Sequence, residues 1–461
     1  MNIIMIISDT FRYDNLFRRA AMPVRATQLE QFARRAVGLS NFYNSSFPTI
    51  PHRTDVTTGR FGWPWYPWQN RNLSGKNHLP SILHQAGYVS QLIADTPHIF
   101  RANFDVGFDG ANLLRGQEAD LPMLRMNYPI ENVMPPEKTR AGRHFQGHNL
   151  VDLHRWENRG WRREEDCFPP RTAALATEWL EENYKWHPFF LWVDFFDPHE
   201  PWDPPEHLVR RYDPDYAGTP MLHPNYGKAS DYTPEELKNL RAHYCAEAEL
   251  VDRWVGRVIQ KIDDLGLWEN TVVVFTSDHG TSLGEHNRTG KSNINDRDDR
   301  AWPIYPEVAH IPFLVAAPGI EGGKTVSALL QPPDILPTLL DLAGVKVQPP
   351  DPVHGRSFAP LVRGQAQEPI RDIAISASHW RRKPGEKVGK AVTPVVYTEK
   401  WAYVPFGPKG ERELYDLAAD PLGEKNVAAA NTRTMDDLQG RLMDWLKKME
   451  APKEAAAALE I

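Results

Sequence analysis

Cysteine is scarce in this chain, since only Cys167 and Cys245 occur among 461 residues. One bridge is possible but a disulfide framework is excluded, and two free thiols in a reducing compartment are the simpler interpretation of the pair. No apolar run approaches the roughly 18 residues of a membrane span. The apolar start, residues 1–7, has no basic segment and is too short for the core of a signal peptide, so it favours a first buried strand. We therefore expect a soluble, cytoplasmic protein that does not bind a membrane.

Basic residues are not in excess either: 53 Lys and Arg stand against 60 Asp and Glu, which gives a net charge of -7. A weakly acidic protein without a basic block gains nothing from a phosphate backbone, so nucleic acid is not an expected partner. An anionic small substrate would have to be attracted by local charge. The balance of 41% hydrophobic and 25% charged residues is that of a globular protein. Oligomeric state is open, a homo-oligomer included.

Short apolar runs alternate with helical patterns along the first 370 residues, which predicts an α/β fold with a doubly wound sheet. The expected strands are Ile3–Ile7, Val89–Ile93, Phe189–Val193, Thr271–Thr276 and Ile311–Val315. The expected helices are Leu29–Ala36, Thr172–Tyr184 and Leu237–Leu265, the last long enough to contain a break. Residues 115–170 and 201–233 lack periodicity, and we expect them to form surface excursions that shape a substrate mouth.

The pattern changes after residue 370, so we divide the chain into a catalytic domain, 1–370, and a C-terminal α+β subdomain, 371–461. Its expected short antiparallel strands are Asp372–Ser378, Ala391–Tyr397 and Trp401–Pro405. A helix is expected from Thr434 because apolar residues follow it at helical spacing. Residues 451–461 are expected to form a frayed tail.

Carboxylates and imidazoles follow the ends of four expected strands, the edge at which open α/β sheets bind ligands. They are Asp9; Asp95 and His98; Asp194, Asp197 and His199; and Asp278 and His279. An Asp at a strand end is often only a turn or cap residue, but four such strands together favour a site. Carboxylate oxygens with an imidazole nitrogen suit Zn²⁺ or Mn²⁺, so Asp9, Asp278 and His279 are the expected metal ligands.

Thr49 opens a possible helix that ends near Gly59. A hydroxyl there would lie beside free backbone N–H groups and the positive end of a helix dipole, a suitable place for a nucleophile that attacks an anionic centre. Arg53, one turn later, could hold a substrate oxygen. A plain capping threonine on a surface helix is the alternative from this segment alone.

Taken in order, these segments resemble the sulfatase family of the alkaline-phosphatase superfamily. The matching phrases are Asp9-Thr10, Thr49-Ile50-Pro51-His52-Arg53 with Thr58-Gly59, Asp197-Pro198-His199, Ser277-Asp278-His279-Gly280 with Lys291, Glu307 to Pro312, and Glu413 to Asn426. The resemblance implies an alkaline-phosphatase-like fold, a large, mostly parallel sheet flanked by helices with a small C-terminal sheet. It also implies a hydrolase that acts on a small anionic ester.

The resemblance implies roles for single residues. Asp9, Asp278 and His279 would hold one divalent ion, Mn²⁺, Zn²⁺ or Ca²⁺, and Thr10 would add a neutral oxygen or nothing. The remaining carboxylates Asp95, Asp194, Asp197 and Asp203 leave a second ion open. Thr49 stands at the nucleophile position, Arg53 and Lys291 would stabilise charge, and His199 or His98 would protonate the leaving oxygen. His286 and Asp95 are candidate substrate contacts.

Thr49 is the main departure from the family, whose nucleophile is a formylglycine made from Cys or Ser. A threonine ester cannot collapse to an aldehyde and must be cleaved by water. Threonine nucleophiles serve phosphoryl transfer in other branches of the superfamily, so we favour a phosphoester, phosphodiester or phosphonate ester as the substrate. A sulfate ester hydrolysed without formylglycine and an inactive binding protein are the alternatives. The family's Gly-Lys-Trp-His phrase is replaced here by residues 94–98, which leaves its lysine role empty.

Overall fold

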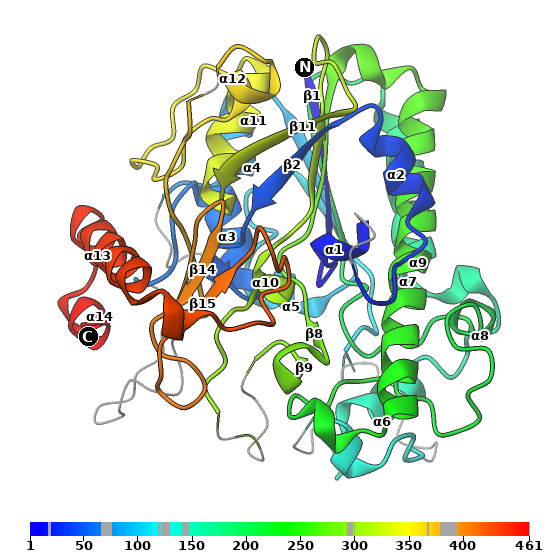
Figure 1. The fold of residues 1–461 in the computed structure, drawn as a ribbon. Coiled ribbons are helices and arrows are strands. Elements are labelled where there is room, and N and C mark those ends of the chain that lie inside the picture. The colour runs from blue at the N-terminus through cyan, green and yellow to red at the C-terminus, as the bar shows by residue number, and fades with distance from the viewer. Residues whose placement is uncertain are drawn as a thin grey trace.

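An eight-stranded mixed sheet forms the centre of the computed structural model, in the order β11-β2-β10-β7-β1-β6-β4-β5 (Figure 1). The described residues are 1–16, 20–65, 76–118, 120, 130–140, 147–292, 298, 300–366, 368–378 and 394–460. The strands are β1 (Asn2–Ser8), β2 (Val37–Phe42), β4 (Val89–Ala94), β5 (Gly110–Leu113), β6 (Phe189–Phe195), β7 (Thr271–Thr276), β10 (Phe313–Ala316) and β11 (Lys324–Leu330). All neighbouring pairs are parallel except those that β10 makes with β2 and β7.

Helices cover both faces of this sheet because the side chains of its central strands are apolar on both sides. Ile4 and Ile6 of β1 belong to the core that packs against α2 (Thr27–Ala33), α7 (Phe168–Asn183) and α9 (Pro234–Asp264). Ile3, Met5 and Ile7 belong to the opposite core, with α3 (Thr49–Thr58), α4 (Leu79–Gln85) and α11 (Ile335–Ala343). The expected α/β fold is confirmed.

The long helix α9 runs without interruption for 31 residues, so the expected break is absent. A capping box starts it, in which Thr233 Oγ1 accepts from Glu236 N and Glu236 accepts from Thr233 N. Gly256 within it brings α2 close, since a Cβ there would lie 2.6 Å from Gln28 Cγ. The shorter helices are α1 (Tyr13–Leu16), α5 (Pro97–Arg101), α6 (Leu150–Glu157), α8 (Glu206–Val209), α10 (Pro306–Ala309) and α12 (Ala359–Val362).

A second sheet lies in the C-terminal part, in the order β15-β14-β13-β12-β3. Its strands are β3 (Ser46–Phe47), β12 (Ala374–Ser378), β13 (Val395–Tyr397), β14 (Trp401–Val404) and β15 (Glu413–Asp416). The expected short antiparallel sheet is confirmed, although β3 comes from the N-terminal part and pairs parallel with β12. The expected strand from Ala391 falls in part on residues 391–393, which lie outside the described residues. The boundary at 370/371 stays a prediction.

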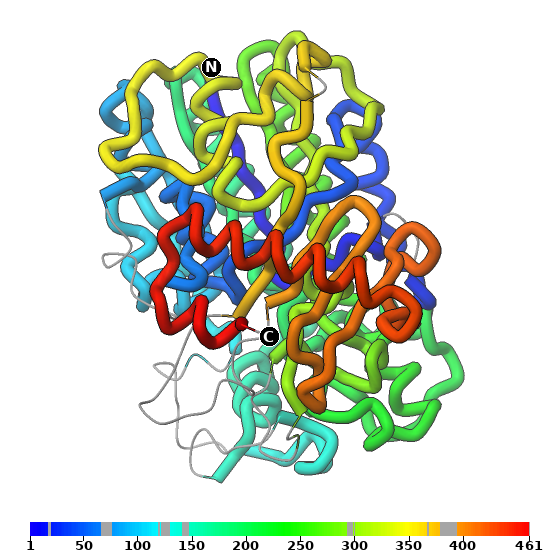
Figure 2. The backbone as a smooth tube through the Cα atoms, turned by 60° about the vertical axis from the view of Figure 1, so that its left-hand side comes forward, coloured from blue at the N-terminus to red at the C-terminus, as the bar shows by residue number. Residues whose placement is uncertain are grey.

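Helix α13 (Thr432–Lys448) crosses the small sheet, and α14 (Lys453–Ala458) turns back beside it (Figure 2). The expectation of a frayed tail is wrong, because Ala455 and Leu459 are fully buried and Leu459 O accepts a hydrogen bond from Gln439 Nε2 at 2.5 Å. A two-residue ladder, β8 (Ser282–Leu283) with β9 (Thr289–Gly290), completes the strands. In the described part of the chain no helix combines the length and apolarity needed to cross a membrane.

Candidate active site

The carboxyl ends of β1 and β7 bring three expected metal ligands together. Asp9 follows β1, and Asp278 and His279 follow β7, which pairs with β1 in the sheet. One ligand atom from each lies within 4.8 Å of the others, and all three residues are fully buried. His279 Nε2 stands 3.7 Å from Asp9 Oδ1 and 3.6 Å from Asp278 Oδ2. Ligands around one tetrahedral ion at about 2.1 Å stand roughly 3.4 Å apart, so this spacing fits a divalent ion.

Two atoms of this cluster support the fit because they are buried without a hydrogen-bond partner among the described residues. They are Asp9 Oδ2 and His279 Nε2. The other ring nitrogen, His279 Nδ1, pairs with Gly280 O at 2.9 Å, which leaves Nε2 as the bare acceptor that a metal requires. Buried polar atoms without hydrogen-bond partners are costly, so these two atoms fit the role of ligands to a cation.

The charges of the three ligands are set by burial and by one another. Burial lowers the pKa of His279 to about 3, so this imidazole is neutral at pH 7. Burial and the charge of Asp278 raise the pKa of Asp9 well above its ordinary value. Burial opposes ionisation of Asp278 too, but the neighbouring His279 and Arg53 outweigh it and hold the pKa of Asp278 well below its ordinary value.

Thr10 joins the cluster through its backbone and its hydroxyl. Its N–H donates to Asp278 Oδ1 at 3.0 Å, and its Oγ1 donates to Asp9 Oδ1 at 2.8 Å. Its φ of 63° is in the left-handed region, a genuine outlier for a β-branched residue. Backbone strain of this kind is characteristic of functional sites. The hydroxyl therefore orients Asp9, and Thr10 acts on the metal site through that carboxylate.

Thr49 is the first residue of α3, which begins after Pro48 and ends at Gly59. Its side chain is almost buried, and within the described residues its hydroxyl has no hydrogen-bond partner. The helix start offers few free amides, because Pro51 has no N–H and His52 N donates to Pro48 O at 3.0 Å. The expected contribution of a helix N-terminus is therefore limited to the first two amides.

Arg53 is bound to protein acceptors in this structure, so the expected contact with a substrate oxygen stays a prediction. Its Nε and Nη2 form a fork with Asp194 at 2.8 and 2.7 Å, and Nη2 also lies 3.3 Å from Asp9 Oδ2. Its Nη1 donates to Thr49 O at 3.1 Å and to Asp278 Oδ2 at 2.7 Å. Four of the five donors of the guanidinium thus make hydrogen bonds, and Nη2 also forms an ion pair with Asp9. Arg53 ties the start of α3 to the metal ligands and neutralises their charge.

Lys291 provides a positive charge in this site, and one of its hydrogen-bond donors is unused among the described residues. Its side chain is 6% exposed, and Nζ donates to Thr10 Oγ1 at 3.1 Å and to Glu200 Oε2 at 3.2 Å. An ammonium group has three donors, so one is left for a substrate oxygen. Burial opposes ionisation of Glu200, but His199 and Lys291 hold its pKa at about 2, so it is ionised and fixes Lys291 in place.

His199 is held in one tautomer by the backbone. Its Nδ1 pairs with Glu200 O at 2.7 Å, which assigns the ring proton to Nδ1 and leaves Nε2 as an acceptor. Burial lowers the pKa of His199 to about 4. The ring of Phe196 stacks on it, with centroids 4.1 Å apart, and also lies 5.9 Å from the ring of His98. His98 Nε2 is bound to Glu118, so His98 reaches this neighbourhood but is already paired.

Two expected substrate contacts have structural partners instead. Asp95 is fully buried and accepts from Thr172 Oγ1 at 2.7 Å and from Phe196 N at 2.6 Å, which anchors the end of β6. His286 Nδ1 lies 3.2 Å from Glu307 Oε1, and its Nε2 lies 2.7 Å from Gly423 O. The structure offers neither side chain to a substrate.

The carboxylates that left a second metal ion open also have partners within the protein. Asp194 binds Arg53, Asp197 accepts from Gln117, and Asp203 pairs with Arg155. Among the described residues, only Asp9, Asp278 and His279 have the spacing of a metal site. The sequence did not indicate a role for Glu200 or Glu118. Glu200 directly follows the Asp197-Pro198-His199 motif, whereas Glu118 lies in a segment without any pattern.

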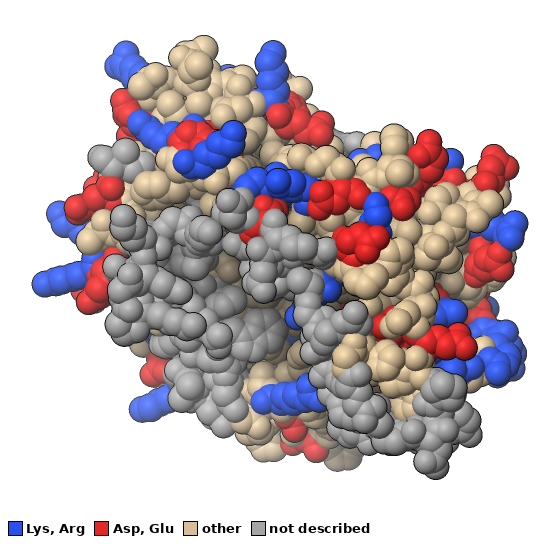
Figure 3. All heavy atoms as spheres, turned by 90° about the horizontal axis from the view of Figure 1, so that it is seen from below, with Lys and Arg blue, Asp and Glu red and all other residues tan. Residues whose placement is uncertain are grey.

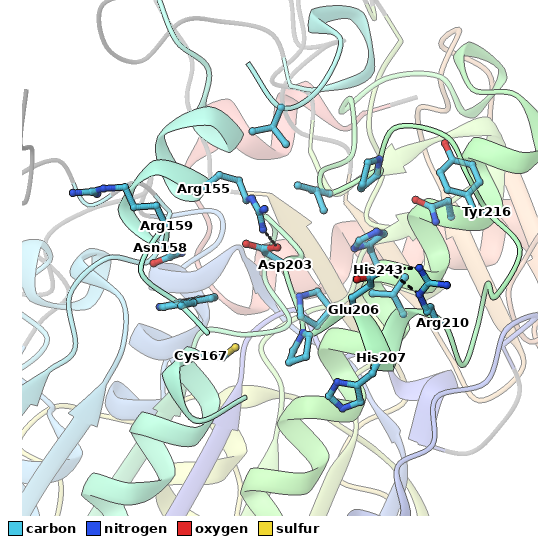
Figure 4. Close-up of a pocket in the computed structure, with 18 of the residues that line it drawn as sticks. Arg155, Asn158, Arg159, Cys167, Asp203, Glu206, His207, Arg210, Tyr216 and His243 are labelled. Carbon is cyan, nitrogen blue, oxygen red and sulfur yellow. Dashed lines mark hydrogen bonds and ion pairs between the residues drawn. The ribbon is translucent and has the colours of Figure 1, made fainter. Parts of the chain in front are cut away.

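A cavity of about 1230 Å³ lies elsewhere, between α6, α8 and α9 (Figure 4). Arg155 and Asp203 point toward each other in it and form an ion pair, and Arg210 and Glu206 form a second pair within one turn of α8. Neither Thr49 nor any of the three candidate metal ligands lines this cavity. On the face seen in Figure 3, acidic and basic side chains intermingle over the described surface.

Solved structures share the fold of this chain. The chain superimposes on the phosphonate monoester hydrolase of Agrobacterium radiobacter with a TM-score of 0.73 at 22% identity, over 97% of this chain and 96% of that one. A likeness at this identity concerns the fold. It confirms the alkaline-phosphatase-like fold that the resemblance implied.

The family follows from the sequence as a whole. The model described as Sulfatase matches residues 1–345, and the one described as N-sulphoglucosamine sulphohydrolase, C-terminal, matches residues 298–452. The chain belongs to the sulfatase family and is a hydrolase of ester bonds. Its relatives include an arylsulfatase of Clostridium perfringens, 25% identical over 91% of this chain and 88% of that protein. Another is an endo-4-O-sulfatase of Bacteroides thetaiotaomicron, 28% identical over 79% of this chain and 71% of that protein.

Proposed function

We propose that the chain hydrolyses a small anionic ester through a covalent intermediate on Thr49, beside a divalent ion held by Asp9, Asp278 and His279. One observation carries most of the weight. Arg53 Nη1 binds both Thr49 O at 3.1 Å and Asp278 Oδ2 at 2.7 Å, which fixes the start of α3 against the metal ligands. The hydroxyl and the metal site therefore belong to one rigid unit.

A bound divalent ion supplies Lewis acidity, which lowers the pKa of a nearby hydroxyl and screens an approaching anion. The residues of the chain do the rest. Lys291 offers its remaining N–H to an oxygen of the anionic group, and Arg53 keeps the carboxylates oriented. Thr10 holds Asp9 through its hydroxyl. These groups are preorganised by buried contacts, as electrostatic stabilisation of a transition state requires.

The reaction proceeds in two displacements. Thr49 Oγ1 forms a bond to phosphorus or sulfur while the bond to the leaving oxygen breaks, and the hydroxyl proton passes to the departing alkoxide. Water then attacks the Thr49 ester, the bond to Oγ1 breaks, and Thr49 regains a proton. His199 is suited to carry these protons because its neutral Nε2 accepts one and can return it.

A phosphorus ester is the substrate we favour, because Thr49 lacks the aldehyde route by which a formylglycine releases sulfate. A sulfate ester is the second candidate, and the names of the sulfatase relatives favour it. An inactive protein that binds such an anion is the third. A buried group of residues with the spacing of a metal site, which includes two ligand atoms without hydrogen-bond partners, favours an enzyme over this third candidate.

The test is a panel of nitrophenyl phosphate, phosphodiester, phosphonate and sulfate esters with protein loaded with Mn²⁺ or Zn²⁺. We expect turnover of a phosphorus ester to fall at least about 10³-fold in Thr49→Ala and to be retained in Thr49→Ser, which keeps the hydroxyl. Thr49-dependent turnover of sulfate alone would establish the second candidate. Turnover that survives in Thr49→Ala would refute the nucleophile, and no turnover of any ester would favour the binding protein.

A further inference from the structure

The segment 225–227 runs beside the short strand β9, which leads directly to Lys291. Thr289 N donates to Gly227 O at 3.1 Å, and Thr289 Oγ1 donates to Asn225 Oδ1 at 2.6 Å. A backbone contact and a side-chain contact therefore fix the segment against the strand.

The ring of Tyr226 lies against the backbone of Gly290, the residue before Lys291. A Cβ at Gly290 would stand 2.9 Å from Tyr226 Cγ, and the φ of Gly290 is 97°, so only glycine suits this position. Tyr226 itself has a φ of 53°, in the left-handed region that residues other than glycine rarely adopt. Backbone strain of this kind is characteristic of functional sites. The strained tyrosine therefore deserves comparison with the chemistry that Lys291 performs.

Buried hydrogen bonds link Tyr226 to the ammonium group of Lys291. The Tyr226 hydroxyl donates to Glu200 Oε1, and Glu200 Oε2 accepts from Lys291 Nζ at 3.2 Å. Tyr226 is 1% exposed and Glu200 is fully buried. Both oxygens of the Glu200 carboxylate are thus held away from solvent, one by the phenol and the other by the ammonium group.

Tyr226 and Glu200 have the protonation states that these hydrogen bonds require. Burial and the charge of Glu200 raise the pKa of Tyr226 well above its ordinary value, so the phenol keeps the proton that it donates. Glu200 is ionised, as described above, and an ionised carboxylate inside the protein needs hydrogen-bond donors on its oxygens. The Tyr226 hydroxyl meets this need at Oε1, which the ammonium group does not contact.

We propose that Tyr226 is a positioning residue, which holds Glu200 so that the unused donor of Lys291 points at the anionic group of the substrate. Lys291 Nζ donates to Thr10 Oγ1 at 3.1 Å and to Glu200 Oε2. Two fixed acceptors determine the direction of the third N–H of a tetrahedral ammonium group. Loss of the Tyr226 hydroxyl would free the Glu200 carboxylate to rotate and would displace Lys291. The inference rests on the proposed function, because that function makes Lys291 a substrate contact.

The discriminating experiment is a double-mutant cycle of Tyr226→Phe and Lys291→Ala, with kcat/KM measured on the best ester of the panel. Tyr226→Phe removes the hydroxyl but keeps the ring that packs on Gly290. We expect it to lower kcat/KM by about 10–100-fold, because a small displacement of a catalytic group is costly. In the Lys291→Ala background it should change kcat/KM by less than about twofold, since the group it positions is gone. An equal loss in both backgrounds would indicate a purely structural hydroxyl, and that result, or an unchanged Tyr226→Phe enzyme, would overturn the inference.

Tyr403→Phe is the matched control, because Tyr403 is also fully buried and its hydroxyl donates to Gln439 Oε1 at 3.1 Å in the C-terminal part of the chain. It should keep the wild-type kcat/KM. A loss as large as that of Tyr226→Phe would show that any buried tyrosine hydroxyl has this effect, and it would contradict the inference.

Failure of the proposed nucleophile is distinguishable from failure of this inference. The cycle does not depend on which group attacks, so turnover that survives in Thr49→Ala would refute the nucleophile alone. If no ester turns over, titration calorimetry of metal-loaded protein with inorganic phosphate decides. Weaker binding in Tyr226→Phe, with no such difference in the Lys291→Ala background, supports the inference. Equal binding by Tyr226→Phe and the wild type, or no binding by the wild type, refutes it.

Discussion

Replacement of Arg53 should lower the free energy of unfolding far more than replacement of an arginine in a surface ion pair. The guanidinium is fully buried and faces three carboxylates, those of Asp9, Asp194 and Asp278. Arg53→Ala would leave these charges without a cation, and removal of one partner from a buried ion cluster costs about 3–5 kcal/mol. Arg53→Lys would keep the charge but lose the fork to Asp194, so we expect an intermediate cost of roughly 1.5–3 kcal/mol.

Urea unfolding at constant pH measures these costs as a shift of the midpoint at an unchanged slope. Arg210→Ala is the control, because Arg210 forms an exposed pair with Glu206 that is worth less than about 1 kcal/mol. Divalent metal should stabilise Arg53→Ala more than the wild type, since the ion then provides the missing positive charge. An Arg53→Ala protein within about 1 kcal/mol of the wild type, but with a raised KM, would refute this reasoning and favour the role in substrate binding.

Three further results are expected. Thr10→Ala should weaken metal binding by about 10–100-fold, because the Thr10 hydroxyl orients Asp9. Competition with a chelator measures this affinity, and an unchanged affinity would contradict the role of the hydroxyl. Burial opposes protonation of His286, but Glu307 and the Gly423 carbonyl raise its pKa to about 9. Protonated His286 should therefore stabilise the fold fully below pH 6.5, and this stabilisation should be lost as the pH rises through 9. Unfolding experiments on His286→Ala should show no such loss. Burial lowers the pKa of His154 to about 3, so the unfolded state binds the extra proton and stability should fall as the pH drops below 6.5, by at most about 1.4 kcal/mol per unit for this group. His154→Asn should make that fall shallower, and an identical slope would exclude His154 as its source.

Central strands could be predicted from the sequence because they are apolar on both faces, as in Ile3–Ile7. The strands β2 and β11 were missed because they carry polar residues and β11 is half exposed at the sheet edge. The direction of β10 could not be predicted, since an apolar run does not reveal whether a strand is antiparallel. The close approach of α2 to α9 could not be predicted either, and it needs Gly256, whose missing side chain makes room for Gln28 of α2.

The metal ligands could be predicted because each follows an apolar strand, and neighbouring strands bring their ends together. The partners of Arg53 could not, since Asp194 lies 141 residues away in sequence and only the fold joins them. His286 resembled a site residue because nothing in the sequence showed that Glu307 and Gly423 would take both of its nitrogens. Glu118, the partner of His98, lies in an irregular segment, where neither periodicity nor a motif predicts which side chains meet.

The central claim is the covalent role of Thr49, and mass spectrometry of acid-quenched protein tests it most directly. Metal-loaded protein would be mixed with an excess of the best ester of the panel, quenched during turnover and digested. The account predicts a peptide heavier by the transferred phosphonyl, phosphoryl or sulfonyl group, with the modification on Thr49 and none in Thr49→Ala. Active protein whose Thr49 peptide stays unmodified at every quench time, with a Thr49→Ala variant that still turns over, would contradict it.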